Sequence, residues 1–232
     1  MSKRSTEQLR EVRIETVHTG AAGAVEIHMG RTRVMCTASL STDPPKWLAE
    51  VDPPRGWVTA EYAMLPGSSP QRSRRGGDGR STEIQRLIGR SLRAGVDLEK
   101  MPGVAIICDC DVLCADGGTR TASITGAYVA LAHAVATARE RGLIEADPLT
   151  GPVAAVSVGL CEGRPTLDLD YRLDRDAEVD MNVVMNGSGR FVEVQGTAEA
   201  GTFGRDQLDH LLDLAGRGIE SLIELQRQAI ES

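Results

Sequence analysis

A glycine pair followed by a threonine and an arginine stands between an apolar run and a run with helical character. The residues are Asp116-Gly117-Gly118-Thr119-Arg120, after residues 104–113 and before residues 121–141. A helix that begins behind glycines presents free backbone N–H groups at the positive end of its dipole, which favours an anion. Arg120 adds a planar, permanently charged guanidinium that suits phosphate. The segment is therefore either a phosphate site or an ordinary turn that needs glycine for a positive φ.

A second cationic segment precedes the first clear helix pattern. Residues 66–80 are rich in glycine, serine and proline, and they contain four arginines and no lysine: Arg72, Arg74, Arg75 and Arg80. Such a composition is typical of a loop. Arginines on a loop of an acidic protein suggest that the loop binds the backbone of a polyanion. The alternative is a solvated surface loop. Arg80 stands directly before the predicted helix, at a second helix start that favours anions.

Carboxylates gather in the second half of the chain. Residues 168–180 hold six acids, and Asp174 and Asp180 would converge if the segment between them folds back. Two converging carboxylates can hold Mg²⁺ or take part in proton transfer, and the alternative is an exposed acidic turn. Together with the cationic segments, they supply the groups that phosphoryl or nucleotidyl transfer requires.

Another set of polar residues alternates along residues 104–113. Cys108, Cys110 and Cys114 have a spacing that could suggest a metal, but on a strand they share a face with apolar residues, so buried structural cysteines are expected. Asp109 and Asp111 face the other way. They are expected to pair with arginines of the preceding helix or with water, and a role in a site is the second possibility.

Composition limits the function further. The chain has 232 residues and a net charge of −7, so any attraction to nucleic acid must come from a local basic cluster. Aromatic residues make up only 3%, which argues against base stacking as the main mode of binding. Five cysteines without a signal peptide predict reduced thiols and a cytoplasmic protein, and no apolar run approaches the roughly 20 residues of a membrane span.

The elements that must position these residues follow from hydrophobic periodicity. The polar residues 1–11 are expected to fray. Two similar α+β halves are predicted within one domain that covers residues 1–232, with a boundary near residues 142–152. The predicted strands are residues 12–17, 25–29, 33–40, 57–65, 104–113, 153–160, 165–171, 179–185 and 190–195, and the predicted helices are residues 81–98, 121–141 and 206–230.

Several runs, spread in order over nearly the whole chain, resemble the RNase PH family. They are WVTAEYAMLP at 57–66, EIQRLIGR at 83–90, DCDVL at 109–113, ADGGTRT at 115–121, DMNVV at 180–184 and EVQGTAE at 193–199. The resemblance implies an α+β fold of duplicated halves, of the ribosomal protein S5 domain 2-like type. It also implies a phosphate-dependent 3′→5′ exoribonuclease, or tRNA nucleotidyltransferase, that releases nucleoside diphosphates and can run in reverse.

The resemblance further assigns roles to individual residues. Arg80, Gly118, Thr119 and Arg120 would bind the attacking inorganic phosphate. Asp174 and Asp180 would be catalytic and would hold Mg²⁺ or Mn²⁺. The RNA 3′ end would be guided by Arg72, Arg74, Arg75, Arg86 and Arg90.

The same resemblance implies the partners. They are RNA, in particular tRNA 3′ ends, and five further copies in a homohexamer built as a trimer of dimers, with no DNA and no membrane. A ring would gather the arginine loops around a channel and reconcile them with the negative net charge. Two rival readings are a non-catalytic RNA-binding ring subunit of the exosome-core type and a hydrolytic nuclease.

Overall fold

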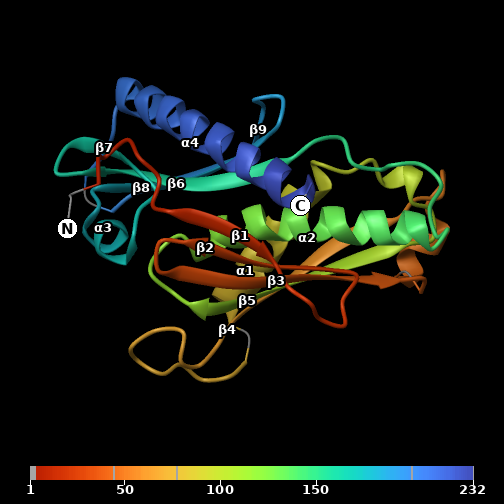
Figure 1. Cartoon of the computed structure of the whole chain (residues 1–232). Coiled ribbons are helices and arrows are strands. Elements are labelled where there is room, and N and C mark those ends of the chain that lie inside the picture. Colours follow the sequence, from red (N-terminus) through yellow and green to blue (C-terminus); the bar gives the residue numbers. More distant parts are fainter. Residues whose placement is uncertain (1–3, 44, 77, 200, 232) are drawn as a thin grey trace.

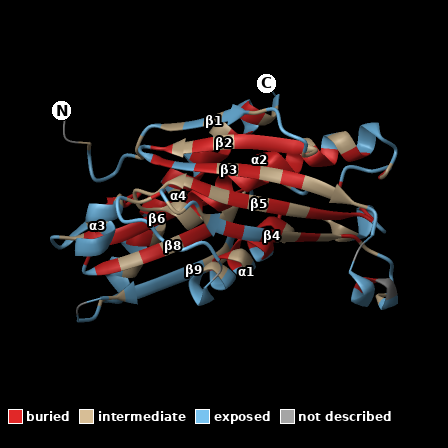
Figure 2. Cartoon of the chain, turned by 90° about the horizontal axis from the view of Figure 1, so that it is seen from below, coloured by how far each residue is buried: buried red, intermediate tan, exposed pale blue. Residues whose placement is uncertain are grey.

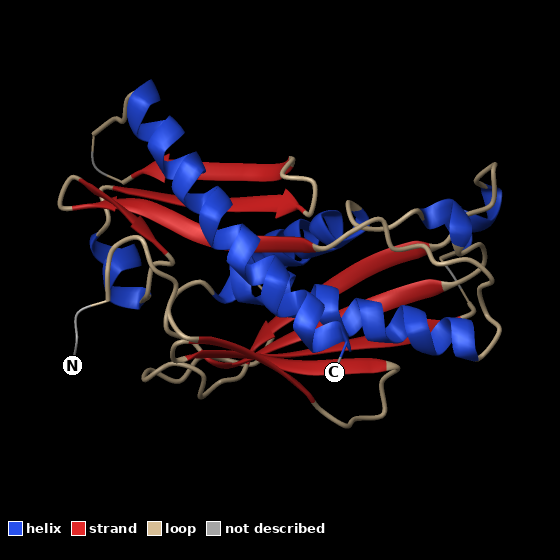
Figure 3. Cartoon of the chain, turned by 45° about the horizontal axis from the view of Figure 1, so that its top comes forward, coloured by secondary structure: helices blue, strands red, loops and turns tan. Residues whose placement is uncertain are grey.

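The computed structural model describes residues 4–43, 45–76, 78–199 and 201–231, and they form two sheets with helices packed between and across them (Figures 1 and 3). The strands are β1 (Val12–Thr16), β2 (Gly23–Met29), β3 (Thr32–Ser41), β4 (Trp57–Met64), β5 (Ala105–Cys114), β6 (Val153–Cys161), β7 (Arg164–Leu167), β8 (Val179–Asn186) and β9 (Phe191–Ala198). The α-helices are α1 (Gly79–Arg93), α2 (Thr119–Glu140), α3 (Tyr171–Asp176) and α4 (Arg205–Glu231), and the 3₁₀ helices are η1 (Lys46–Glu50) and η2 (Leu98–Lys100).

The first sheet has the order β1-β2-β3-β5-β4. All its neighbours are antiparallel except β4 and β5, which run parallel because α1 connects them as a crossover. The carboxyl ends of β4 and β5 therefore lie at the same edge of the sheet. The loop that follows β4 carries the arginines, and the loop that follows β5 carries the glycine pair, so the topology brings both cationic segments to one place.

The second sheet is antiparallel, with the order β7-β6-β8-β9. A tight turn at residues 187–190 joins β8 to β9, as the Asn-Gly pair predicts. Among the edge strands, β1 and β9 are mostly exposed, whereas the inner strands β2 and β6 are mostly buried (Figure 2).

Helix α2 runs between the two sheets and contacts β2 and β3 of the first and β6 of the second (Figure 1). Fifteen of its 22 residues are buried, so its apolar surface extends around most of the helix. Small residues permit this close packing. A Cβ atom added at Gly126 would lie 2.7 Å from the Ile27 Cγ2 atom and 2.9 Å from the Cys36 Sγ atom. Helix α4 packs across β6 and β7 and also contacts α2.

The α+β fold of two strand-rich halves is confirmed, and three local predictions are wrong. The helix predicted to reach residue 98 ends at Arg93, because Gly95 has a low helix propensity and Val96 pairs instead with Leu149 in an isolated β-bridge. The strand predicted to reach residue 171 ends at Leu167, because Asp168 takes a positive φ of 56°. The segment after it forms the short helix α3, which the sequence pattern did not indicate.

The N-terminal segment also differs from its prediction. Residues 4–10 do not fray, since the Leu167 N–H donates to the Thr6 carbonyl at 2.7 Å and the side chains of Arg4 and Arg10 bind Asp168. Residues 1–3 lie outside the described part of the chain. None of the helices within the described ranges combines the length and apolarity needed to cross a membrane.

Candidate active site

The glycine pair forms the turn between β5 and α2, with φ values of 77° at Gly117 and 67° at Gly118. Gly118 stands at the N-cap position of α2, and no side chain caps the helix there. The first N–H groups of α2 therefore have no acceptor from a capping side chain. The turn does require a positive φ at both glycines. The phosphate site remains a prediction, which the uncapped start of α2 would suit.

The Arg120 side chain lies where α1, α2 and β9 meet. Its Nη1 atom donates to the Gln195 Oε1 atom at 3.1 Å and lies 3.7 Å from the Glu83 Oε1 atom. The Gln195 amide in turn donates to Glu83 at 3.2 Å. The guanidinium is only 18% exposed, so these contacts hold it in a fixed place beside the start of α2.

Arg80 is the second residue of α1, not the residue before it as the sequence suggested. Asp78 caps the helix by accepting from the Ser81 N–H at 2.8 Å. The hydrogen bonds from Ser81 lower the pKa of Asp78. Because a carboxylate already occupies this helix start, the attraction of α1 for a second anion depends on the Arg80 side chain.

The acids of the second half converge on these arginines. Asp174 lies on α3 and Asp180 on β8. Asp174 is exposed on the surface of α3, although neighbouring groups partly bury its carboxylate. Partial burial and the charge of Asp180 raise the pKa of Asp174, while Arg120 and Arg80 act in the opposite direction. Asp180, Arg120 and Arg80 are thus within electrostatic reach of Asp174, although the four residues come from four elements and from both halves of the chain.

Tyr62 belongs to this cluster, although sequence reasoning gave it no role. It is buried on β4, and its hydroxyl forms a hydrogen bond of 2.8 Å with the Thr119 hydroxyl. Burial raises the pKa of Tyr62, and the nearby charges of Arg80 and Arg120 lower it. The available signal was its place on the strand that leads to the arginine loop, within the run at 57–66.

The arginines predicted to guide RNA occupy two places. Arg72, Arg74 and Arg75 are exposed in the loop after β4, and Arg86 and Arg90 are exposed on α1. Arg90 already has a protein partner, because its Nε atom donates to the Glu193 carboxylate at 2.7 Å. Residue 77 of the loop lies outside the described ranges.

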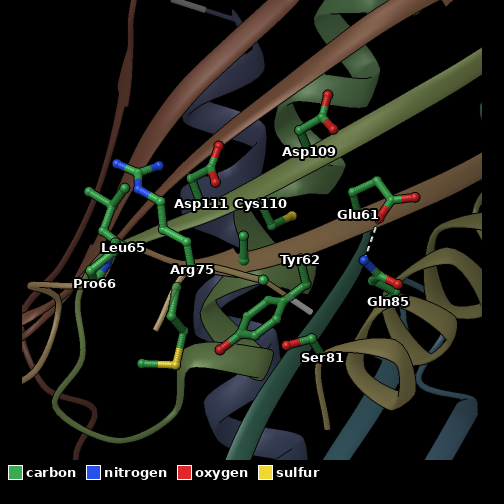
Figure 4. A pocket seen from close by; sticks show the side chains of 13 residues that line it. Glu61, Tyr62, Leu65, Pro66, Arg75, Ser81, Gln85, Asp109, Cys110 and Asp111 are labelled. Carbon is green, nitrogen blue, oxygen red and sulfur yellow. Dashed lines mark hydrogen bonds between the residues drawn. The ribbon is translucent and has the colours of Figure 1, made fainter. Parts of the chain in front are cut away.

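Arg75 lines an open cavity of about 360 Å³ beside β4 and β5, together with Tyr62, Glu61, Asp109 and Asp111 (Figure 4). Glu61 accepts a hydrogen bond from Gln85.

The prediction that Asp109 and Asp111 pair with arginines of the preceding helix is wrong, since neither forms an ion pair with any described residue. Burial, and then the charges of Asp111 and Glu61, raise the pKa of Asp109.

Two of the three cysteines on β5 are buried, as the sequence predicts. Cys108 and Cys110 are buried as free thiols under α2, and burial raises the pKa of Cys108 well above its usual range. Cys114 is only half-buried at the end of β5. Across the described residues, no group of three or more histidine, cysteine, aspartate or glutamate side chains is placed to hold a metal ion.

Comparison with protein families identifies the chain. Residues 8–136 match domain 1 of the 3′ exoribonuclease family, and residues 151–218 match domain 2 of the same family. The chain belongs to the RNase PH (3′ exoribonuclease) family. The family uses phosphate to degrade RNA, and the chain is accordingly a phosphate-dependent 3′→5′ exoribonuclease. Arg80 and Arg120 fall within the first match, and Asp174 and Asp180 fall within the second.

Relatives of the family cover nearly the whole chain. The Ribonuclease PH of Corynebacterium efficiens is 53% identical over 98% of this chain and 94% of its own. The Ribonuclease PH of Corynebacterium glutamicum is 52% identical over the same shares. An Archaeoglobus fulgidus exosome structure with RNA bound to the active site shares the fold, with a TM-score of 0.82 and 22% identity over 95% of this chain and 90% of that chain. An archaeal exosome core structure has a TM-score of 0.78 and 20% identity over 97% and 89% of the two chains.

Proposed function

We propose that this chain trims the 3′ ends of tRNA precursors and other RNA at the site formed by Arg80, Gly118–Arg120, Asp174 and Asp180. One observation carries the proposal: beside the uncapped glycine turn at the start of α2, the Arg120 side chain is held 3.1 Å from the Gln195 Oε1 atom and 3.7 Å from the Glu83 Oε1 atom. The phosphate ion would lie between the two arginines and the open start of α2. The acids would lie beside the oxygen that leaves.

The reaction exchanges one phosphorus–oxygen bond for another. An oxygen of the inorganic phosphate forms a bond to the phosphorus of the terminal RNA linkage, and the bond from that phosphorus to the 3′ oxygen of the preceding nucleotide breaks. The 3′ oxygen takes up a proton and becomes the new RNA end, and the terminal nucleotide leaves as a nucleoside diphosphate. Since the bond broken resembles the bond formed, the reverse addition of nucleotides also runs at this site.

Electrostatics is the main obstacle, because both reactants are anions. Arg80, Arg120 and the first N–H groups of α2 place positive charge where the two anions must meet. Tyr62 supports this arrangement by holding the Thr119 hydroxyl at 2.8 Å. Asp174 or Asp180 would assist the transfer of a proton to the leaving 3′ oxygen.

The donor set of the two acids fits a hard divalent cation. Mg²⁺ in phosphoryl-transfer sites commonly takes one or two carboxylates and completes its shell with water and substrate oxygens. Asp174 and Asp180 provide such a pair and not a complete protein cage, in keeping with the absence of any larger ligand group among the described residues. When bound, Mg²⁺ or Mn²⁺ would neutralise charge on the leaving oxygen.

We also propose that Arg72, Arg74, Arg75 and Arg86 guide the RNA. Arg90 would bind RNA only after its hydrogen bond to Glu193 breaks. The chain is proposed to act as a homohexamer of three dimers. Family membership and the fold shared with the exosome-core structures support this assembly. The test is light scattering after gel filtration: a mass six times that of one chain supports it, and a stable monomer or dimer contradicts it.

The two halves are proposed to form one domain that divides near residues 142–152. Each half supplies one sheet, but a single continuous core of buried residues spans both sheets and α2. Limited proteolysis that released two separately folded halves would contradict this proposal.

The decisive experiment for the function incubates RNA with a free 3′ hydroxyl, with and without inorganic phosphate. The expected products are nucleoside diphosphates that form only when phosphate is present. Nucleoside monophosphates formed without phosphate would indicate a hydrolytic nuclease, and no products would indicate a non-catalytic ring subunit.

Arg120→Ala is expected to lower kcat/KM about 10²–10³-fold. Arg217→Ala, which removes an exposed arginine on α4, is the matched control and should have no effect.

A further inference from the structure

The N-terminal segment lies against the carbonyl side of the glycine turn, opposite the proposed phosphate position. The Arg10 Nη1 atom donates to the Asp116 carbonyl at 2.7 Å, and its Nη2 atom donates to the Gly117 carbonyl at 3.4 Å. The Thr32 hydroxyl also donates to the Gly117 carbonyl, at 2.7 Å, and accepts from the Asp116 N–H at 3.0 Å. Both carbonyls of the turn are therefore fixed by side chains from remote parts of the chain.

Fixing these carbonyls also fixes the N–H groups of the turn. A trans peptide unit is planar, and its C=O and N–H groups point in opposite directions. When the Asp116 and Gly117 carbonyls point toward Arg10, the N–H groups of Gly117 and Gly118 must point to the other side. Those two N–H groups therefore point away from Arg10, toward the side that the proposed phosphate would occupy. The orientation of the donors for phosphate thus depends on a guanidinium that does not itself reach the phosphate.

Arg10 is in turn held by Asp168. The Asp168 carboxylate is fully buried and accepts from the Arg10 Nη2 atom at 2.6 Å, from its Nε atom at 2.9 Å and from its backbone N–H at 2.8 Å. Arg4 adds a bond of 3.0 Å to the Asp168 carbonyl. Asp168 has a positive φ of 56°, a strained conformation for a residue with a side chain. Removing either partner of this buried ion pair would leave an uncompensated charge, so Arg10 and Asp168 are held together firmly.

The same contacts align the two halves of the site. The Asp116 carbonyl that Arg10 binds also accepts from the Tyr171 N–H at 3.1 Å, at the first residue of α3. Gly117 packs directly on this helix start, where an added Cβ would lie 2.5 Å from the Asp170 carbonyl carbon. Arg10 and Asp168 therefore set the distance between the glycine turn and the helix that carries Asp174.

We propose that Arg10 and Asp168 are positioning residues for phosphate. They orient the peptide units at residues 116–118 so that their N–H groups face the ion. They also keep the glycine turn at a fixed distance from the start of α3. The proposal rests on the proposed function, in which Gly118–Arg120 bind phosphate.

The test is Arg10→Lys. A lysine keeps the charge that Asp168 needs, but its single ammonium group cannot fork to two carbonyls and a carboxylate as the guanidinium does. The expected result is a rise in KM for phosphate of roughly tenfold to a hundredfold, with KM for RNA unchanged. A purely structural role would lower the melting temperature and the fraction of active enzyme and leave KM for phosphate unchanged. That result would overturn the proposal.

Two controls accompany it. Arg13→Lys changes an exposed arginine on the neighbouring strand β1 and should leave both KM values unchanged. Asp168→Asn keeps the shape of the side chain and suits a positive φ. It serves as the variant if Arg10→Lys does not fold, and it is expected to raise KM for phosphate in the same way. An unchanged KM for phosphate in a folded Asp168→Asn would also overturn the proposal.

Arg120→Ala, measured in parallel, separates the positioning role from the phosphate site itself. If Arg120→Ala leaves KM for phosphate unchanged, the proposed phosphate site is wrong. If Arg120→Ala raises it and the Arg10 and Asp168 variants do not, the phosphate site stands and the positioning role is wrong.

Discussion

The ionised Asp174 carboxylate is expected to destabilise the folded protein, although the proposed reaction requires it. Its pKa is raised in the folded protein by partial burial and by Asp180. A carboxyl group whose folded pKa is raised binds its proton more tightly in the native state than in the unfolded chain. Its favourable contribution is complete below the unfolded pKa of about 3.9 and is lost as the pH rises through the folded pKa. At neutral pH the ionised group therefore destabilises the fold.

Asp174→Asn is thus expected to abolish phosphorolysis at neutral pH and to raise the melting temperature slightly. The increase is small because solvent screens an exposed residue. The difference in melting temperature between the variant and the parent should disappear near pH 3, where Asp174 is protonated in both states. A melting temperature that falls at neutral pH, or near-normal turnover, would contradict this assignment. Asp176→Asn, on the exposed end of α3, is the control for activity.

Tyr62 gives a milder test of the same site. Tyr62→Phe removes only the hydroxyl that bonds to Thr119 at 2.8 Å. A neutral hydrogen bond contributes about 1 kcal/mol, so kcat/KM for phosphate is expected to fall about fivefold. Steady-state rates over a range of phosphate concentrations measure the change. An unchanged kcat/KM would show that Thr119 needs no support from this hydroxyl.

At the scale of elements, the predictable features are those set by local sequence. Alternation along β3 and β5 and the 3.6-residue period of α1 and α4 depend on neighbours within a few residues, so these elements were predictable within a few positions. The positive φ at Gly117 and Gly118 follows from glycine itself. The charge of the arginine loop and of the acidic segment could also be read directly.

The features that escaped prediction depend on contacts across the chain. The N-terminal segment is ordered because Arg10 meets Asp168, 158 positions away in sequence. Helix α3 forms where Asp170 caps it and the glycine turn packs on it. Tyr62 enters the site only because α1 returns the chain to a parallel strand. Local sequence does not specify such pairings, since each depends on the folded arrangement of segments far apart in the chain.

Helix α2 provides the prediction at this scale. Gly126→Val is expected to destabilise the protein by about 2–3 kcal/mol, because even the first added carbon would lie within 3 Å of Ile27 and Cys36. Gly216→Ala on α4 is the matched helical control. An added Cβ there meets no atom within 4 Å, so the better helix propensity of alanine should stabilise by about 0.5–1 kcal/mol. Thermal unfolding measures both, and a destabilisation of similar size at the two positions would contradict the close packing of α2.

At the scale of the whole molecule, the net charge of −7 opposes RNA while the arginine loop attracts it. The effect of the net charge and the effect of the loop can be measured separately. An arginine that neutralises a phosphate of the RNA releases a counterion, whereas the net charge acts only through an electrostatic field that salt screens. The dependence of RNA binding on salt therefore reports how many arginines touch the RNA backbone. The loop arginines are exposed and form no ion pairs with described residues, so they are free to touch that backbone.

The triple variant Arg72→Ala, Arg74→Ala and Arg75→Ala is therefore expected to reduce the slope of log affinity against log salt by about 2. Each phosphate of a single strand that an arginine neutralises adds about 0.7 to this slope. Binding of a 3′-hydroxyl RNA, followed by fluorescence anisotropy at several salt concentrations, measures the change. Removing three exposed arginines elsewhere, Arg164, Arg190 and Arg217, changes the net charge equally and should leave the slope unchanged. If the loop variant weakens RNA binding without changing the slope, the loop acts through assembly of the ring and not by touching RNA, and gel filtration of the variant would then show a smaller particle.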